Sequence, residues 1–113
     1  MRVKTFDFPS FEEWFNTNMN NLNSNDYGFK NNIGSYVADI SPFCWYPDSV
    51  TYMAAIACSH NPHNIYAPSI SKKYTFRYYR DKHSIDDLRK WYQEVCIKLN
   101  EDFANYIYET YLV

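Results

Sequence analysis

The sequence predicts an α+β fold: a helix near the N-terminus, a small sheet of about three strands that we expect to be antiparallel, and a long C-terminal helix packed on that sheet. Two segments repeat apolar residues at helical spacing, and each begins with a capping pattern. Between them lie three short runs of strand-like composition, separated by turn residues. A chain of 113 residues suits one compact domain, so we expect residues 1–113 to share a single core.

The N-terminal helix is expected over residues 10–22. Ser10 and Glu13 have the spacing of a capping box, in which the hydroxyl and the carboxylate each accept a hydrogen bond from a backbone N–H of the first turn. The apolar face comprises Phe11, Trp14, Phe15, Met19 and Leu22. Because asparagine amides compete for backbone hydrogen bonds, the helix should end among the asparagines that follow, in a region of Asn and Gly turn residues.

Three strand-like runs come next. Residues 35–41 alternate in polarity, and Pro42 should end this strand. Residues 50–59 are apolar on both faces, as in a central strand that is covered on each side. Residues 71–80 alternate cleanly, which directs Tyr74, Phe76 and Tyr78 toward the core and Lys73, Thr75, Arg77 and Tyr79 toward solvent.

The C-terminal helix has the strongest pattern in the chain. Ser84 and Asp87 repeat the capping arrangement. One face is then apolar for more than six turns and comprises Ile85, Leu88, Tyr92, Val95, Cys96, Leu99, Phe103, Tyr106 and Ile107. Trp91, Tyr108 and Tyr111 fall beside this stripe, where they could form the seam of a homodimer.

The composition combines many aromatic residues with very few glycines. The chain contains 12 Tyr, 8 Phe and 3 Trp but only two Gly. Twelve tyrosines exceed what a core of this size should hold, and exposed tyrosine is a frequent anchor in binding surfaces. The shortage of glycine argues against phosphate-cradling loops. The formal charge of −2 provides no general attraction for nucleic acids or anionic membranes.

A local excess of basic residues interrupts this mildly acidic chain. Five basic side chains stand between residues 72 and 82 against one acidic side chain, and they are Lys72, Lys73, Arg77, Arg80 and Lys82. We predict a partner-binding surface made of Lys73, Arg77, Tyr79 and Arg80, because planar arginine donors beside a tyrosine ring suit carboxylates and phosphates. Three interpretations stay open: contact with an acidic protein surface, contact with single-stranded nucleic acid, and a charged edge strand that only prevents aggregation. We expect replacement of both arginines by glutamate to leave stability nearly unchanged.

A second candidate surface is the aromatic run Phe43-Cys44-Trp45-Tyr46 between two prolines. We expect residues 43–48 to form an ordered loop. Three aromatic rings in such a loop are costly to leave in water, so the loop either folds back on the core or anchors a partner. Trp45 and Tyr46 are therefore included among the predicted partner-binding residues.

The only candidate for metal or nucleophile chemistry is Cys58-Ser59-His60-Asn61-Pro62-His63. Cys58, His60 and His63 could bind zinc, with Cys44 or Cys96 as a further ligand, but the paired, closely spaced ligands of structural zinc sites are missing. A Cys–His nucleophile pair is a further alternative. We favour a buried strand cysteine followed by an ordered polar loop over residues 60–68, and we predict no metal, cofactor or catalytic residue.

The three cysteines are odd in number and widely spaced, and the first residues lack the unbroken apolar run of a signal peptide. No apolar stretch is long enough to span a bilayer. Reduced thiols in the cytoplasm fit this pattern.

Small size, the absence of a catalytic motif, and abundant Asn, Tyr, Ile and Lys resemble small inhibitors encoded by phages and mobile elements, anti-CRISPR proteins among them. Toxin-neutralising immunity proteins share much of this size and composition. The resemblance implies a protein without cofactor that occupies the working surface of a larger enzyme or nucleoprotein complex. Our first hypothesis is therefore a cytosolic inhibitor of a host defence enzyme. The alternatives are an immunity protein, a nucleic-acid-binding accessory protein that uses residues 72–82, and, least favoured, a small Cys/His metalloprotein or enzyme.

Overall fold

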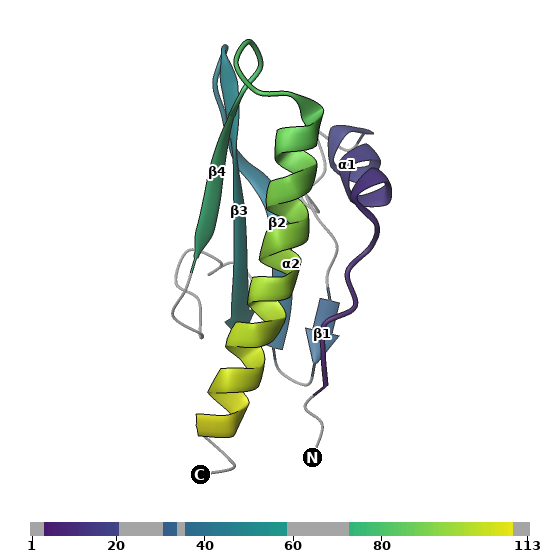
Figure 1. Ribbon diagram of the computed structural model, residues 1–113, viewed down its shortest axis with the longest axis vertical. Helices are drawn as coiled ribbons and strands as arrows, with labels where there is room; N and C mark the ends of the chain where they lie inside the picture. The colour runs from purple at the N-terminus through teal and green to yellow at the C-terminus, as the bar shows by residue number, and fades with distance from the viewer. Residues whose placement is uncertain (1–3, 21–30, 34–35, 59–72, 110–113) are drawn as a thin grey trace.

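The computed structural model in Figure 1 describes residues 4–20, 31–33, 36–58 and 73–109. Along the chain, its elements are α1 (Phe11–Asn20), β1 (Asn31–Ile33), β2 (Tyr36–Trp45), β3 (Ser49–Cys58), β4 (Tyr74–Tyr79) and α2 (Ile85–Ile107). The predicted α+β fold is confirmed: a short N-terminal helix and an antiparallel sheet are followed by a long C-terminal helix that packs on the sheet.

The sheet has the order β1-β2-β3-β4, and each neighbouring pair is antiparallel. Both helices lie on one face of it, as Figure 1 shows. The even-numbered residues of β3 and β4 face these helices, whereas the odd-numbered residues face away, on what we call the outer face. The predicted side-chain alternation of β4 is confirmed, because Tyr74, Phe76 and Tyr78 pack against the core.

The second strand differs from its prediction. β2 does not end at Pro42 but continues through Trp45. The register with β3 shifts between Pro42, which pairs with Tyr52, and Cys44, which pairs with Thr51. Proline lacks an N–H and is tolerated in a sheet at such a bulge. The aromatic run at residues 43–46 is therefore the end of a strand and the start of a hairpin, not a loop.

Two further differences concern the rest of the sheet. The short strand β1 adds a fourth, edge position in a segment where turn residues dominate the sequence. β3 was expected to be covered on each side, but both helices cover the same face. Met53 and Ala55 are nevertheless buried on the outer face, with 2% and 0% of their surface exposed. The predicted loop at 60–68 lies outside the described residues.

The core forms where α1, α2 and the sheet meet. Trp14 is 1% exposed, and its ring stacks on Tyr92 of α2 with 4.6 Å between the ring centroids. Its indole N–H donates a hydrogen bond to the carbonyl of Ile40 in β2 over 2.7 Å. The predicted cap at Ser10 is present, since its hydroxyl accepts from the N–H of Glu13. The side chain of Trp14 thus joins α1, α2 and the sheet.

The long helix is held at both ends. At its start, the carboxylate of Asp87 accepts a hydrogen bond from the N–H of Ser84 over 2.9 Å, as the capping pattern predicts. Farther along, the side-chain amide of Asn100 both accepts from the N–H of Phe6 and donates to its carbonyl. The side chains that α2 buries are Leu88, Tyr92, Val95, Leu99 and Phe103, which confirms the predicted face except at its start, where Ile85 is 38% exposed.

Leu99 lies in the middle of this buried stripe and is 1% exposed. We expect Leu99→Ala to lower the free energy of unfolding by about 2–5 kcal/mol, through lost burial and a residual cavity. Ile97, on the same helix but 60% exposed, provides the control, and Ile97→Ala should change stability by no more than about 0.5 kcal/mol. Denaturant titrations measure both. Equal effects of the two substitutions would overturn the helix phase.

Candidate functional site

The predicted binding residues converge at the tip of the β2–β3 hairpin. The turn closes with a hydrogen bond of 2.8 Å from the N–H of Tyr46 to the carbonyl of Ser49. Ser49 in turn pairs with Tyr79 of β4. Tyr46, Ser49 and Tyr79 thus form one row across the outer face. Arg77 belongs to the next row, opposite Thr51. Sheet register therefore joins two segments that the sequence presents as separate candidates.

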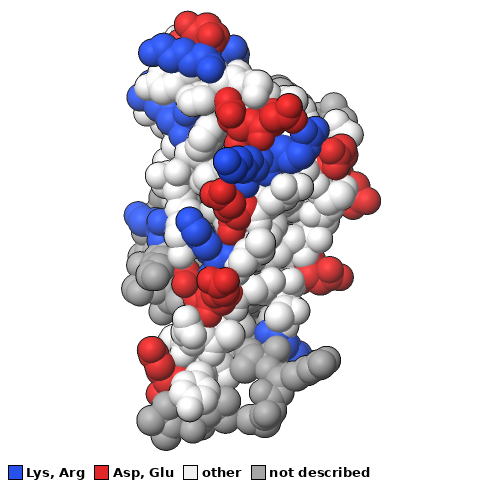
Figure 2. All heavy atoms as spheres, viewed as in Figure 1, with Lys and Arg blue, Asp and Glu red and all other residues white. Residues whose placement is uncertain are grey.

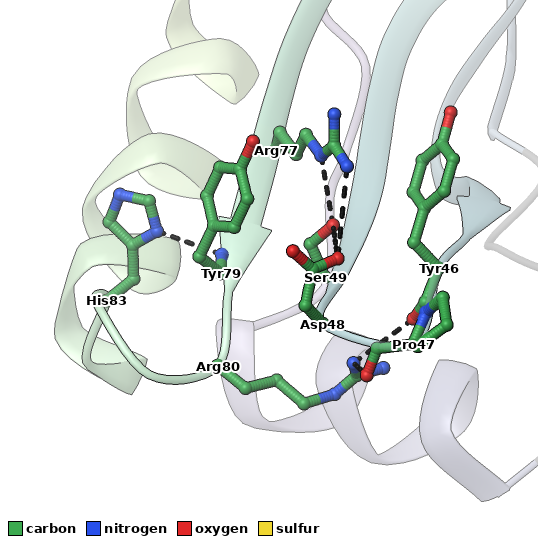
Figure 3. Close-up of polar contacts among 8 residues, drawn as sticks. All are labelled: Tyr46, Pro47, Asp48, Ser49, Arg77, Tyr79, Arg80 and His83. Carbon is green, nitrogen blue, oxygen red and sulfur yellow. Dashed lines mark hydrogen bonds and ion pairs between the residues drawn. The ribbon is translucent and has the colours of Figure 1, made fainter.

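Arg77 lies between two tyrosine rings, as Figure 3 shows. Its guanidinium carbon is 4.3 Å from the centroid of the Tyr46 ring and 5.0 Å from that of Tyr79. Cation–aromatic contacts of this kind each contribute about 0.5–1 kcal/mol at exposed sites. We call the group Tyr46, Asp48, Ser49, Arg77 and Tyr79 the hairpin patch.

A buried hydroxyl fixes the orientation of Arg77. Ser49 is fully buried, and its Oγ accepts a hydrogen bond of 2.9 Å from Nε of Arg77 while donating to Asp48 over 3.1 Å. The Asp48 carboxylate also lies 3.9 Å from Nη2 of Arg77. Nε of Arg77 thus donates to Ser49 and Nη2 faces Asp48, while Nη1 makes none of the described polar contacts and is available as a donor to a partner.

Arg80, a predicted partner-binding residue, makes hydrogen bonds within the hairpin. Its Nη1 donates to the carbonyls of Tyr46 and Pro47, over 3.2 and 2.8 Å, so it closes the hairpin turn from beneath (Figure 3). The expectation that Arg77 and Arg80 are dispensable for stability is corrected by these contacts. Both arginines hold the hairpin to the end of β4, and a double reversal of charge would disturb the turn as well as any binding.

Tyr46 presents its ring to solvent with a protonated hydroxyl. The residue is 41% exposed. The pKa of its hydroxyl is raised, first by a hydrogen bond with the side chain of Cys44, then by the negative charge that this side chain carries as a thiolate, and then by desolvation. The phenol is protonated at physiological pH even at the ordinary tyrosine pKa, and the shift acts in the same direction. Tyr46 thus offers a flat apolar ring whose hydroxyl can donate or accept a hydrogen bond.

The other two predicted residues lie apart from the hairpin patch. Trp45 pairs with Val50, which places it on the opposite side of the hairpin from Tyr46, although it is also 41% exposed. Lys73 precedes β4, four residues before Arg77, and an extended chain separates these positions by about 13 Å. Neither residue belongs to the cluster around Arg77.

Sequence reasoning missed Ser49, Asp48 and His83. Nδ1 of His83 accepts a hydrogen bond of 3.0 Å from the N–H of Tyr79, which braces the last residue of β4 (Figure 3). A serine directly before an apolar strand looks like an ordinary turn residue. Its role depends on which strand lies beside it, and no local pattern shows that.

The Cys/His candidates for metal or nucleophile chemistry lie largely outside the described residues. His60 and His63 lie outside the described residues, and so does the side chain of Cys58. Within the part of the chain that is described, Cys44 and Cys96 are free thiols and no group of His, Cys, Asp and Glu could hold a metal ion. Burial raises the pKa of the Cys96 thiol to about 11, which leaves it almost wholly protonated at neutral pH.

The charges on the helix side of the molecule are mixed. Figure 2 shows basic and acidic side chains interspersed over this face, without a continuous field of one sign. An example is Arg89, which contacts Glu12 and Asp86 and lies over the ring of Phe11. Among the described helices, none is long and apolar enough to cross a membrane.

Comparisons of the chain with protein-family models, with curated proteins and with solved structures return no match.

We expect Arg77→Met to lower the free energy of unfolding by about 1 kcal/mol, because it leaves the buried Ser49 hydroxyl without its charged donor and removes the cation between the two rings. Lys82→Met is the matched control. Lys82 also lies over the Tyr79 ring, at 5.3 Å, but holds no buried group, so its replacement should cost no more than about 0.5 kcal/mol. Urea denaturation of both variants tests this. Equal stability of Arg77→Met and the wild type would contradict a stabilising role for the contacts of Arg77 with Ser49 and the two rings.

Proposed function

We propose that this protein is a non-enzymatic binding protein that docks onto an acidic surface of a larger protein through the hairpin patch and thereby blocks that surface. The observation that carries the proposal is the Tyr46–Arg77–Tyr79 stack, an exposed arginine held in place between two rings. Arginine and tyrosine are the residue types that most often dominate binding energy at interfaces.

Preorganisation supports this assignment. A free arginine loses much side-chain entropy when it binds, whereas the side chain of Arg77 is already fixed by Ser49 and by the rings. Its Nη1 group makes none of the described polar contacts and can donate a charge-assisted hydrogen bond to a carboxylate. The partner surface should therefore carry an aspartate or glutamate, flanked by apolar area that covers Tyr46 and Tyr79.

The sequence hypothesis of a stoichiometric inhibitor is compatible with such a patch. We propose that the protein acts in the cytoplasm, where its thiols stay reduced, and that its source is a phage or mobile element and its target a host defence enzyme. An immunity protein would use the same mode of action against a toxin. The nucleic-acid hypothesis has less support, because a phosphate backbone is tracked by several cations in a row, whereas Arg80 is engaged within the hairpin and Lys73 lies apart from Arg77.

An affinity experiment tests this function. The tagged protein is incubated with lysate of the host cells, and the recovered material is assayed for protein, nucleic acid and metal. We expect one protein partner at a fixed molar ratio. Tyr46→Ala should weaken its binding at least tenfold, about 1.4 kcal/mol, because an exposed anchor ring is lost while the Ser49–Arg77 bond is kept.

Tyr108→Ala is the matched control, because Tyr108 is 59% exposed but belongs to the far end of α2. It should leave affinity unchanged. Recovery of nucleic acid with a steep dependence on salt would favour the nucleic-acid hypothesis instead. A partner that binds Tyr46→Ala and Arg77→Met with full affinity would remove the hairpin patch as the binding site.

A further inference from the structure

The outer edge of β4 carries backbone groups that are positioned for another strand. β4 is the last strand of the sheet. The N–H of Arg80 bonds to Asp48 on the β3 side, and hydrogen bonds alternate along an antiparallel pair. The even-numbered residues of β4 therefore bond to β3, and Thr75, Arg77 and Tyr79 direct their N–H and C=O groups away from the sheet.

One end of this edge is already closed. The outward N–H of Tyr79 donates to Nδ1 of His83, and its carbonyl accepts from the N–H groups of Lys82 and His83. An added strand can therefore pair only with the stretch around Thr75 and Arg77. A short, partly capped edge is a usual means of limiting unwanted strand pairing. The free part of the edge, around Thr75 and Arg77, is long enough to pair with a short peptide.

A groove of about 460 Å³ lies beside this edge, between β4 and α2. It is lined by Phe76, His83, Asp87, Lys90, Trp91 and Glu94. The rings of Phe76 and Trp91 are 5.8 Å apart and form its apolar part. The indole N–H of Trp91 makes none of the described hydrogen bonds, in contrast with that of Trp14. The groove thus combines two rings, two carboxylates, one lysine and an available donor.

Strand addition would place a side chain in this groove. A residue opposite Phe76 on an added strand points to the same face of the sheet as Phe76, which is the face toward α2. That side chain would lie against the rings of Phe76 and Trp91, within reach of the carboxylates that line the groove. The backbone pairing and the groove therefore belong to one site.

The groove chemistry favours a basic side chain. Elsewhere the chain places its own cations over rings next to carboxylates: Lys98 over Tyr74, whose hydroxyl donates to Asp102, and Arg89 over Phe11. Among the described residues, no cation lies over Phe76 or Trp91 in this way, and Glu94 makes no ion pair. An arginine or lysine from outside would complete the same arrangement.

We propose that the β4 edge and the adjoining groove bind an extended, basic segment of a partner protein, which pairs with Thr75 and Arg77 as an added strand and places an arginine or lysine side chain over Trp91. Strand addition of this kind derives affinity from the main chain and specificity from alternate side-chain pockets. The groove faces α2, whereas the hairpin patch lies on the outer face; the sites share only Arg77, through its backbone in one and its side chain in the other, and separate variants test them.

A second copy of this chain does not fit the groove equally well. In a β4–β4 pair, the side chains directed to the helix face would be Tyr74, Phe76 and Tyr78. None of them is basic, and the acidic groups of the two grooves would then face aromatic rings and each other. Buried carboxylates without a cationic partner are unfavourable. Charge complementarity therefore favours a foreign basic segment.

The test uses the full-length protein and a displayed library of random heptapeptides as the probe. We expect enrichment of peptides in which one arginine or lysine is flanked by β-branched or aromatic residues at alternate positions. Binding of the best peptide should shift the amide resonances of Thr75 and Arg77 in NMR spectra. Failure to enrich any peptide, or enrichment of peptides without a basic residue, would overturn the proposal.

Matched variants locate the site. Thr75→Pro removes an outward N–H without breaking a bond to β3, whereas Thr75→Val keeps that N–H. We expect Thr75→Pro to weaken peptide binding at least tenfold and Thr75→Val to leave it within twofold, with circular dichroism confirming that both fold. Equal affinity of the two variants contradicts strand addition.

Charge variants test the preference for a basic side chain. Glu94→Gln should weaken binding at least threefold, whereas Glu101→Gln, on the same helix but outside the groove, should not. Lys90→Gln should strengthen binding, because it removes a like charge from the groove. Sedimentation of the free protein adds a last outcome: a dimer that Thr75→Pro abolishes would identify a second copy as the occupant and overturn the proposal.

Discussion

The structure depends on burying the indole of Trp14 without leaving its N–H unpaired. The side chain is 1% exposed, and its N–H reaches the carbonyl of Ile40 over 2.7 Å. An indole buried without that acceptor would cost about 1–3 kcal/mol. The bond also determines where α1 can lie, because a carbonyl of β2 must be within reach. Stacking on Tyr92 then draws α2 to the same face of the sheet.

Because both helices lie on one face of the sheet, they leave the hairpin tip on the outer face and the edge of β4 uncovered. The outer face at the hairpin tip carries Arg77 and its two tyrosines, and the β4 edge carries unpaired backbone groups beside Trp91. Most of the aromatic excess is thereby explained: one part forms the core around Trp14, and another part orders cations at the surface.

The sequence predicted those features that depend on local periodicity. The buried stripe of α2 and the alternation of β4 both follow from spacing within one element, and both are confirmed. The continuation of β2 past Pro42 was not predictable in this way, because a proline usually ends a central strand. The register shift between Pro42 and Cys44 accommodates the proline, and this shift depends on the pairing with β3. The contact of Tyr46 with Arg77 depends on register across three strands, and the sequence presents these two residues in separate segments. Lys73 was included with Arg77 because both are basic, although the length of the strand separates them.

His83 joins the two surfaces. Its Nδ1 accepts from the N–H of Tyr79, which belongs to the hairpin patch, while its ring packs at 5.1 Å from Phe76, which lines the groove. The acceptor nitrogen carries no proton, so the imidazole proton of the neutral ring sits on Nε2. This one side chain closes the end of the β4 edge, and its ring lies 6.0 Å from the ring of Tyr79, which contacts Arg77. The two proposed binding surfaces, on opposite faces of a single strand, therefore share one brace, because His83 accepts from the backbone of Tyr79 and packs on Phe76.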